Sequence, residues 1–151
     1  MSDVNEYVSS LVASPRVGRQ VVHQRILPPK TAFLSHPRKP WAKEIQGILA
    51  QAGIERLYKH QADALDLVRE GENVVVATPT ASGKSLIYNL PVVESVLDDP
   101  EARALYLFPL KALAQDQLRA FNEMASACSA AKPSAAIYDG DTTAWQRKKI
   151  R

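Results

Sequence analysis

The most constraining feature of the sequence is a short, continuous run of apolar and largely β-branched residues at 73–77. Such a run is typical of a strand that is buried on both faces of a sheet. A glycine-containing turn follows, and apolar residues then recur at helical spacing from about Lys84 to Leu97, with Pro91 expected to kink the helix. The sequence therefore predicts a strand, a tight turn and a helix in direct succession.

Two further stretches continue this alternation. Residues 104–108 and 135–138 are short and apolar, as buried strands are, and a helical pattern that begins at about Lys111 separates them. Right-handed crossovers join such strands into a mainly parallel sheet with helices on both faces. We therefore expect an α/β fold, a three-layer sandwich, for residues 57–151.

Residues 1–56 have a different character. A helical pattern behind Ser2, the expected N-cap, stops at Pro15, and prolines then interrupt every regular pattern as far as Pro40. A second helix is expected between Pro40 and Gly53, with the glycine as its C-terminal cap. This N-terminal region is therefore predicted to be helical and extended, ahead of the α/β part.

Composition limits the chemistry that the chain can support. Its 151 residues, 46% of them hydrophobic, suffice for one core, and the net charge of +3 suits a polyanionic partner without indicating one by itself. Cys128 is the only cysteine, which excludes an intrachain disulfide or a zinc site built from cysteines. The sequence has no signal-peptide pattern and no apolar run of about 18 residues, so we expect a soluble cytoplasmic protein without a membrane partner.

A candidate phosphate-binding loop lies between the predicted strand and the predicted helix. Its residues are, in order, Thr78, Pro79, Thr80, Ala81, Ser82, Gly83, Lys84 and Ser85. Main-chain N–H groups and a helix N-terminus can surround phosphate oxygens, so all of them are candidate nucleotide contacts. We assign Lys84 to the β and γ phosphates of ATP and the Ser85 hydroxyl to Mg²⁺, as the catalytic pair. An ordinary turn between a strand and a helix is the alternative.

The segment upstream of this loop is a candidate site for the adenine base. It opens a helix that is expected from about His60 to Glu70. The Gln61 amide offers one donor and one acceptor, which match the N6 and N7 edge of adenine. Tyr58, Lys59 and Gln61 are therefore candidate base contacts. Taken alone, Gln61 is more simply a solvated helix residue, and the nearby loop favours the adenine interpretation.

Two segments at the ends of the second and third predicted strands are candidates for nucleic-acid contact. Loops at the carboxyl ends of parallel strands gather into a binding crevice. Pro109, Lys111 and Ala112 lie where a lysine and helix amides can meet phosphates without reading bases. Gly140 and Thr142 offer main-chain amides and a hydroxyl. A helix start with a solvated lysine and a turn shaped by aspartates are the alternatives.

Taken in order, four segments resemble the first RecA-like domain of the DEAD/DEAH-box helicases of superfamily 2. They are Leu-Tyr-Lys-His-Gln at 57–61, Ala-Thr-Pro-Thr-Ala-Ser-Gly-Lys-Ser at 77–85, Tyr-Leu-Phe-Pro-Leu-Lys-Ala-Leu-Ala-Gln-Asp-Gln at 106–117 and Tyr-Asp-Gly-Asp-Thr at 138–142. The loop is most similar to that of the mitomycin-repair-factor type of DExH helicase, relatives of RecQ helicases with a C-terminal zinc-binding domain. The resemblance implies ATP-dependent 3′-to-5′ movement on DNA, a role in DNA repair, and a second helicase domain that completes the ATP site.

The sequence departs from the family pattern in several places. Thr78 and Ala81 stand where related loops carry glycine, and we expect the following Gly-Lys-Ser turn to make most of the phosphate contacts. The acidic pair that holds Mg²⁺ for hydrolysis is absent, because the acidic residues at 98–101 flank a proline and indicate a turn. The charged stretch at 145–151 ends without a stop signal, so we expect a cut there and a chain that alone binds nucleotide but does not unwind nucleic acid.

Two other functions fit parts of the sequence. A truncated protein that binds nucleotide or nucleic acid without turnover is favoured by the missing acidic pair. A phosphoryl-transfer kinase with a similar loop is disfavoured by Thr78 and by residues 108–112, which such a kinase does not need. An acidic helicase motif in the coding sequence beyond Arg151 would favour the motor.

Overall fold

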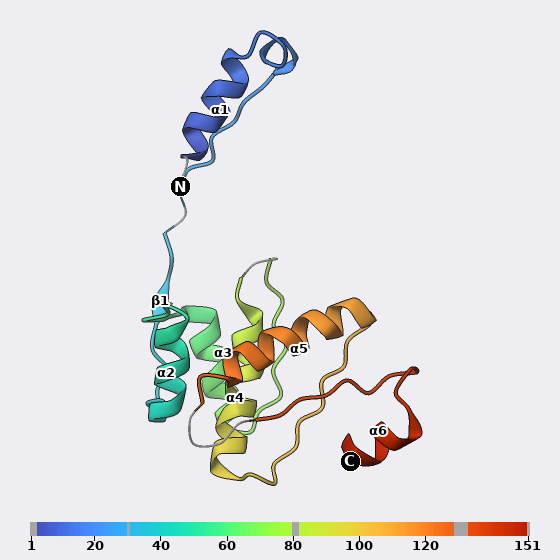
Figure 1. The fold of residues 1–151 in the computed structure, drawn as a ribbon. Coiled ribbons are helices and arrows are strands. Elements are labelled where there is room, and N and C mark those ends of the chain that lie inside the picture. Colours follow the sequence, from blue (N-terminus) through green and yellow to red (C-terminus); the bar gives the residue numbers. More distant parts are fainter. Residues whose placement is uncertain (1–2, 30, 80–81, 129–132, 151) are drawn as a thin grey trace. The chain divides into compact units, whose positions relative to one another are not determined.

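The computed structural model describes residues 3–29, 31–79, 82–128 and 133–150. Contacts between residues divide the chain into two compact units, Met1–Thr31 and Ala32–Arg151. The second unit begins ahead of Leu57, so the segment from Ala32 onward packs with the part of the chain that carries the motifs (Figure 1).

The first unit is one helix followed by a tight turn. Helix α1, Val4–Ala13, begins after Asp3, whose carboxylate accepts a hydrogen bond of 3.0 Å from the main-chain N two residues further on. The predicted cap, Ser2, lies outside the described residues, and Asp3 is the N-cap because its side chain satisfies a free helix N–H. The helix ends before Pro15, as predicted, and the 3₁₀ turn η1, Gly18–Gln20, follows. No residue of α1 or η1 is buried.

The connector, which we define as residues 31–42 ahead of α2, contains a strand that the sequence did not predict. Strand β1, Leu34–Ser35, pairs antiparallel with β2, Leu57–Tyr58, and Leu34 lies opposite Tyr58. The main-chain N of Lys59 donates a hydrogen bond of 2.7 Å to the oxygen of Phe33 and extends the pairing. A strand of two residues is too short to leave a period-two pattern in the sequence.

Helix α2, Lys43–Gln51, buries the apolar face that the sequence predicted, with Ile45, Ile48 and Leu49 inward. Gly53 has the left-handed φ of +68° that a helix C-terminus favours. The main-chain N of Ile54 then donates to the oxygen of Leu49 at 2.8 Å, which satisfies one of the last helix carbonyls. The predicted role of Gly53 as a C-terminal cap is confirmed.

Three longer helices build the centre of the second unit (Figure 1). Helix α3, Lys59–Arg69, packs against α4, Lys84–Asp98, and α5, Lys111–Ala125, adds its C-terminal half to the core. The core consists of Ile45, Ile48, Leu49, Leu57, Ala62, Leu65, Leu90, Val93, Phe121, Ala125 and Cys128. Each fully buried aliphatic side chain contributes roughly 1.5 to 3 kcal/mol. The helices predicted at 60–70, at 84–97 and from Lys111 are confirmed.

The three predicted strands are not confirmed. Residues 73–77, 104–108 and 135–138 form neither strand nor helix, and the β1–β2 pair is the only sheet within the described part of the chain. A strand is held by main-chain hydrogen bonds to its neighbours, and among the described residues these segments have no strand partner. The continuous apolar runs therefore did not produce buried strands here.

Burial along two of these segments nevertheless alternates with a period of two. Val74 and Val76 are half-buried, whereas Val75 between them is 96% exposed. Leu105 and Leu107 are each 84% exposed. One side of each segment is thus covered and the other is bare, whereas the sequence predicted burial of both faces.

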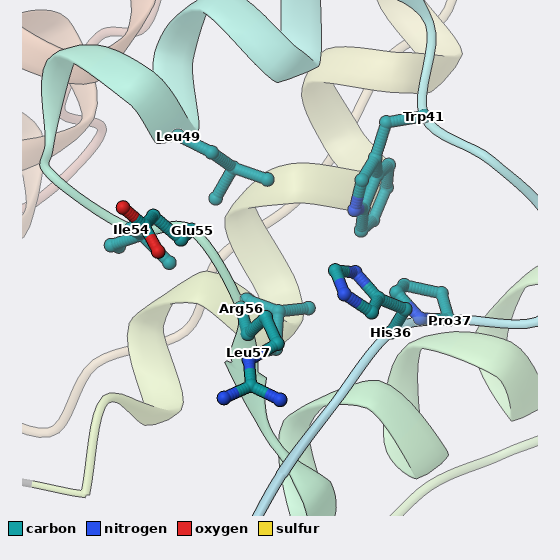
Figure 2. A pocket seen from close by; sticks show the side chains of 8 residues that line it. All are labelled: His36, Pro37, Trp41, Leu49, Ile54, Glu55, Arg56 and Leu57. Carbon is teal, nitrogen blue, oxygen red and sulfur yellow. The ribbon is translucent and has the colours of Figure 1, made fainter.

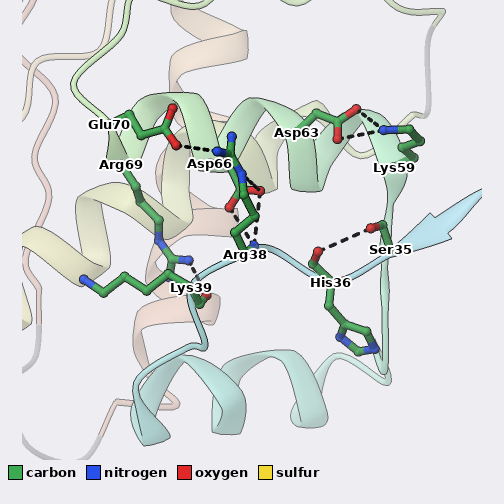
Figure 3. A network of polar contacts seen from close by, with 9 residues as sticks. All are labelled: Ser35, His36, Arg38, Lys39, Lys59, Asp63, Asp66, Arg69 and Glu70. Atoms are coloured by element: carbon green, nitrogen blue, oxygen red, sulfur yellow. Dashed lines mark hydrogen bonds and ion pairs between the residues drawn. The ribbon is translucent and has the colours of Figure 1, made fainter.

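Polar contacts tie the connector to α3 (Figure 3). The buried carboxylate of Asp66 accepts hydrogen bonds from the main-chain N of Arg38 at 2.9 Å and from its Nε at 3.2 Å. Arg38 also pairs with Glu70 at 2.7 Å, one turn further along α3. Because Asp66 accepts hydrogen bonds from both the main chain and the side chain of Arg38, it holds the backbone of the connector against α3.

A second ion pair joins α3 to α4. Arg69 donates from Nε and Nη2 to the two carboxylate oxygens of Glu94, at 2.8 and 2.7 Å. Its Nη1 donates to the main-chain oxygen of Lys39, and its guanidinium lies 3.7 Å from the ring centroid of Trp41. The pair is largely buried, so it is screened little by solvent.

The chain continues into α6, Ala144–Ile150, which contains the charged stretch that begins at residue 145, with Arg151 outside the described residues. Within the described ranges, no helix combines the length and the apolar character that a membrane crossing requires.

Candidate nucleotide-binding site

Gly83 sets the bend between the loop and α4. Its backbone is left-handed, with φ +71° and ψ 28°, and it is the N-cap of the helix. A Cβ atom at this position would lie 2.4 Å from Gln61 Nε2, which is closer than any real contact. The backbone angle therefore requires glycine, and any side chain here would also displace the Gln61 amide from its hydrogen bond to Gly83. The bend makes Lys84 the first residue of α4, where the free N–H groups of a helix lie.

The side chain of Lys84 folds back into the loop. Its Nζ donates to the main-chain oxygens of Thr78 at 2.9 Å and Pro79 at 2.8 Å. It also lies 3.2 Å from Ser82 Oγ and 3.3 Å from Thr78 Oγ1. The positive charge therefore lies within the loop that the sequence assigned to phosphate groups.

Ser85 is the loop residue that the sequence assigned to the metal ion. Thr80 and Ala81 lie outside the described residues, and the half-buried Ser85 is in the first turn of α4. A serine hydroxyl in that turn is a suitable oxygen ligand for a magnesium ion that a nucleotide carries. In the described part of the chain, no group of three or more His, Cys, Asp or Glu side chains could hold a metal ion.

Gln61 joins the predicted adenine segment to the loop. Its Nε2 donates to the main-chain oxygen of Gly83 at 2.9 Å, and its Oε1 accepts from the main-chain N of Tyr58 at 2.9 Å. The side chain is almost completely buried, so it is not the solvated helix residue that the sequence left open. Both polar atoms are engaged by the backbone, and adenine could bind to them only by replacing these bonds. The adenine role of Gln61 stays a prediction.

Of the residues next to Gln61 in the sequence, His60 contacts the loop and Lys59 is directed to the surface of α3. His60, which the sequence reasoning missed, places Nε2 3.2 Å from the main-chain oxygen of Ser82 and stacks on the ring of Tyr58 with 5.8 Å between centroids. Lys59 instead pairs with Asp63 at 2.8 Å on the surface of α3. The Tyr58 ring is therefore beside the loop, whereas the structure pairs the Lys59 charge within its own helix.

The two candidate nucleic-acid segments lie together. Lys111, the first residue of α5, forms ion pairs with Asp141 and, at 3.7 Å, with Asp139. Its hydrogen bond to Asp141 raises the pKa of Lys111, and a hydrogen bond from the main-chain N of Asp141 lowers the pKa of Asp139. The Lys111 side chain is exposed to solvent as well as paired, so its role in binding nucleic acid stays a prediction. Pro109 and Ala112 are exposed beside it.

The turn that carries Gly140 and Thr142 is closed by its own hydrogen bonds. Thr142 Oγ1 accepts from the main-chain N of Asp139 at 2.8 Å, which engages the hydroxyl that the sequence assigned to nucleic acid. Arg147 of α6 donates to the main-chain oxygens of Thr142 at 2.8 Å and Asp139 at 3.2 Å. Sequence reasoning missed Arg147, because it stands in a charged run without a motif.

Tyrosines connect the helix that follows the loop to the helix that begins at Lys111. Tyr88 of α4 donates a hydrogen bond of 2.7 Å to Gln117 of α5. Tyr106 donates to Asn89 at 3.1 Å, and burial, followed by the charge of Tyr88, raises the pKa of Tyr106 to about 12. The two candidate binding segments are therefore mounted on helices that contact each other through side chains.

A cavity near the connector is not large enough for a nucleotide (Figure 2). Its volume is about 30 Å³, which is the share of liquid volume that one water molecule takes. Its walls are formed by His36, Pro37, Trp41, Leu49, Ile54, Glu55, Arg56 and Leu57. None of them belongs to the loop at 78–85, so the loop remains the candidate site.

Comparison with known proteins gives consistent matches. A family model described as DEAD/DEAH box helicase matches residues 58–151. YprA from Bacillus subtilis, described as an uncharacterized ATP-dependent helicase, is 40% identical over 144 residues, or 95% of this chain. The ATP-dependent helicase HRQ1 from Saccharomyces cerevisiae is 37% identical over 152 residues, which cover 100% of this chain. The chain spans 19% of the length of YprA and 14% of the length of HRQ1.

A solved structure agrees with these relatives. The DUF1998 helicase MrfA, in a crystal structure bound to DNA and AMPPNP, matches with a TM-score of 0.76 and 43% sequence identity. The match covers 82% of this chain and 17% of that one. The resemblance predicted from the four motifs, including its mitomycin-repair-factor type, is confirmed.

Proposed function

Because the chain belongs to the DEAD/DEAH box helicase family, we propose that it forms the nucleotide-binding part of the first motor domain of an ATP-dependent DNA helicase or translocase. The observation that carries the proposal is the position of Lys84, whose ammonium group lies within a loop at the start of α4. A RecA-like domain follows from the family. Its mainly parallel, three-layer form is part of the proposal, and the succession of apolar runs and helical patterns along residues 73–138 is what supports it.

ATP with Mg²⁺ is the proposed ligand of this loop. The ammonium group of Lys84 would meet the β and γ phosphates and compensate their negative charge. The N–H groups in the first turn of α4 have no partner within the helix and would bind phosphate oxygens. Ser85 would ligate the metal ion, which draws electrons from the phosphoryl group that is transferred.

DNA is the proposed polymeric partner. The surface around Lys111 and the turn at 138–142 would contact phosphates of the backbone, since ammonium and amide groups bind them without reading bases. The structure of MrfA with DNA supports this choice. A second helicase domain that completes the ATP site, a cytoplasmic location and a role in DNA repair belong to the same proposal.

A binding measurement tests the proposal directly. Isothermal titration calorimetry of the chain with Mg-ATP should give saturable binding with one nucleotide per chain. Inorganic phosphate at the same concentration is the control, because a loop that holds only single anions would bind it equally well. Failure of the chain to bind Mg-ATP would contradict the nucleotide site. A second measurement uses the protein made from its complete coding sequence. If that protein binds ATP but does not hydrolyse it when DNA is added, a non-catalytic binding protein is supported instead.

A further inference from the structure

Thr78 stands at the position where strict phosphate-binding loops have glycine, and its hydroxyl is in use. Thr78 Oγ1 lies 2.6 Å from Ser82 Oγ, so a hydrogen bond between the two side chains spans the loop from its first residue to its fifth. Glycine has no side chain and could not make this bond. Threonine in place of glycine therefore adds a side-chain hydrogen bond to the loop.

We propose that Thr78 is a positioning residue of the nucleotide site, whose hydroxyl, together with that of Ser82, holds Lys84 in place to receive a phosphate. This inference rests on the proposed function, because it specifies how the same loop binds ATP. It assigns to the threonine a role that glycine could not fill.

The hydrogen bonds of Lys84 show which of its protons is available. An ammonium group has three N–H donors. The two shortest contacts, to the carbonyl oxygens of Thr78 and Pro79, take two of them. The third is shared between the hydroxyl oxygens of Ser82 and Thr78 at the longer distances of 3.2 and 3.3 Å. A charged phosphate oxygen is a stronger acceptor than either hydroxyl, so the third N–H would donate its hydrogen bond to the phosphate, while the ammonium group keeps its bonds to the two carbonyl oxygens.

The hydroxyl pair also has a proton to offer. The two hydroxyls carry two protons, and their mutual hydrogen bond uses one of them. The other is free to bond to a phosphate oxygen once that oxygen has displaced the third contact of Lys84. The pair therefore helps to orient the lysine and would add one donor for a phosphate oxygen.

The β-branched side chain of Thr78 contributes in a second way. The χ1 angle of a β-branched residue is restricted. Threonine also allows a smaller range of φ and ψ angles at the start of the loop than glycine does. Both effects reduce the conformational entropy that the loop loses when a nucleotide binds. Thr78→Gly should therefore weaken binding, even though it restores the strict pattern.

The test compares three variants at position 78 with a matched control. Thr78→Val keeps the shape without the hydroxyl, Thr78→Ser keeps the hydroxyl, and Thr78→Gly restores the strict pattern. Thr31→Val makes the same chemical change in the connector, outside the loop. The dissociation constants of Mg-ATP and Mg-ADP are measured by calorimetry, and that of AMP by competition with a fluorescent ATP analogue, because AMP has neither a β nor a γ phosphate.

The expected change in affinity differs between nucleotides that have a β phosphate and AMP, which has none. Thr78→Val and Thr78→Gly should weaken Mg-ATP and Mg-ADP about threefold to tenfold, the usual effect of one hydrogen bond, and should leave AMP unchanged. Thr78→Ser should stay within about twofold of the wild type. In combination with Ser82→Ala, Thr78→Val should add little to the effect of Ser82→Ala alone, because both remove the same bond. If Thr78→Val fails to fold, as judged by circular dichroism, Ser82→Ala alone provides the test.

Two results would overturn the inference while the wild type still binds ATP. If Thr78→Gly bound Mg-ATP with the affinity of the wild type, glycine at this position would be sufficient and the threonine hydroxyl would have no role in binding. An equal loss for AMP, ADP and ATP would show that the hydroxyl supports the fold of the loop and not the phosphates. A wild-type chain that does not bind Mg-ATP would contradict the proposed function itself, so the two failures are distinguishable.

Discussion

Gln61 and Gly83 are held together by a hydrogen bond of 2.9 Å from the glutamine Nε2 to the glycine main-chain oxygen, across 22 positions of sequence. The space that a side chain at Gly83 would need is filled by the same amide. Helix α3 thus fixes the last bend of the loop before Lys84, and a residue predicted to read the base supports the phosphate loop.

Gln61→Ala should therefore weaken the binding of ATP and the binding of GTP to a similar extent. The substitution leaves the main-chain oxygen of Gly83 and the main-chain N of Tyr58 without their partner, at a cost of about 1 to 3 kcal/mol in the free energy of unfolding. Calorimetry with both nucleotides and urea denaturation measure the two effects, with the exposed Gln51→Ala as control. A loss confined to ATP would instead support direct reading of adenine.

Lys84→Ala should abolish DNA-stimulated ATP hydrolysis in the protein made from its complete coding sequence, with a loss of at least about 100-fold in kcat. The reason is that the variant removes the charge that the loop holds for the phosphates. A phosphate-release assay measures the rate, and Lys148→Ala, in α6, removes the same charge elsewhere. Turnover at the wild-type rate would refute the assignment of this loop.

Asp141→Asn should strengthen DNA binding, because it removes one of the two carboxylates that pair with Lys111 and leaves only the longer pair with Asp139 to compete with a phosphate. The slope of log K against log salt concentration should steepen by up to about 0.7, the value for one additional phosphate contact on single-stranded DNA. Fluorescence anisotropy with a single-stranded oligonucleotide at several salt concentrations measures both. Asp98→Asn makes the same change of net charge at the end of α4, and an equal gain there would mean that net charge alone is responsible.

Glu94→Ala should lower the free energy of unfolding by about 3 kcal/mol, because it leaves the guanidinium of Arg69 largely buried without its carboxylate. Chemical denaturation followed by circular dichroism measures the change. Glu101→Ala breaks an exposed pair with Arg103 and should cost less than about 1 kcal/mol. Equal effects would show that the Arg69 pair is not a structural contact of α3 and α4.

Tyr106 should make the fold sensitive to alkali. Its pKa is raised from 10.0 to about 12 in the folded state, so the folded protein retains a proton that the unfolded chain loses. The stability from this proton is complete below pH 10 and decreases as the pH rises towards 12. In Tyr106→Phe, the free energy of unfolding should fall less steeply over this interval, and Tyr7→Phe, an exposed site in α1, should leave the slope unchanged. A parallel decline in both variants would contradict the role of Tyr106.

Features that depend on a few neighbouring residues could be read from the sequence. Gly53, Gly71 and Gly83 all have positive φ angles where the sequence placed a helix end or the loop, because only glycine adopts them freely. The helical spacing of apolar residues located α2 to α5, and the Gly-Lys-Ser triplet located the start of α4. The family could also be recognised from the order of its motifs.

The sequence alone therefore determined the helices, the glycine turns and the loop, since each is governed by local backbone preferences and by periodicity. The tertiary structure alone decided which side chains meet: Gln61 with Gly83, Asp66 with Arg38, and Lys111 with Asp141. These partners are 22, 28 and 30 positions apart, and no local pattern encodes such a pairing. The three predicted strands are not confirmed for a related reason, because a strand needs hydrogen bonds to a partner that its own residues do not specify.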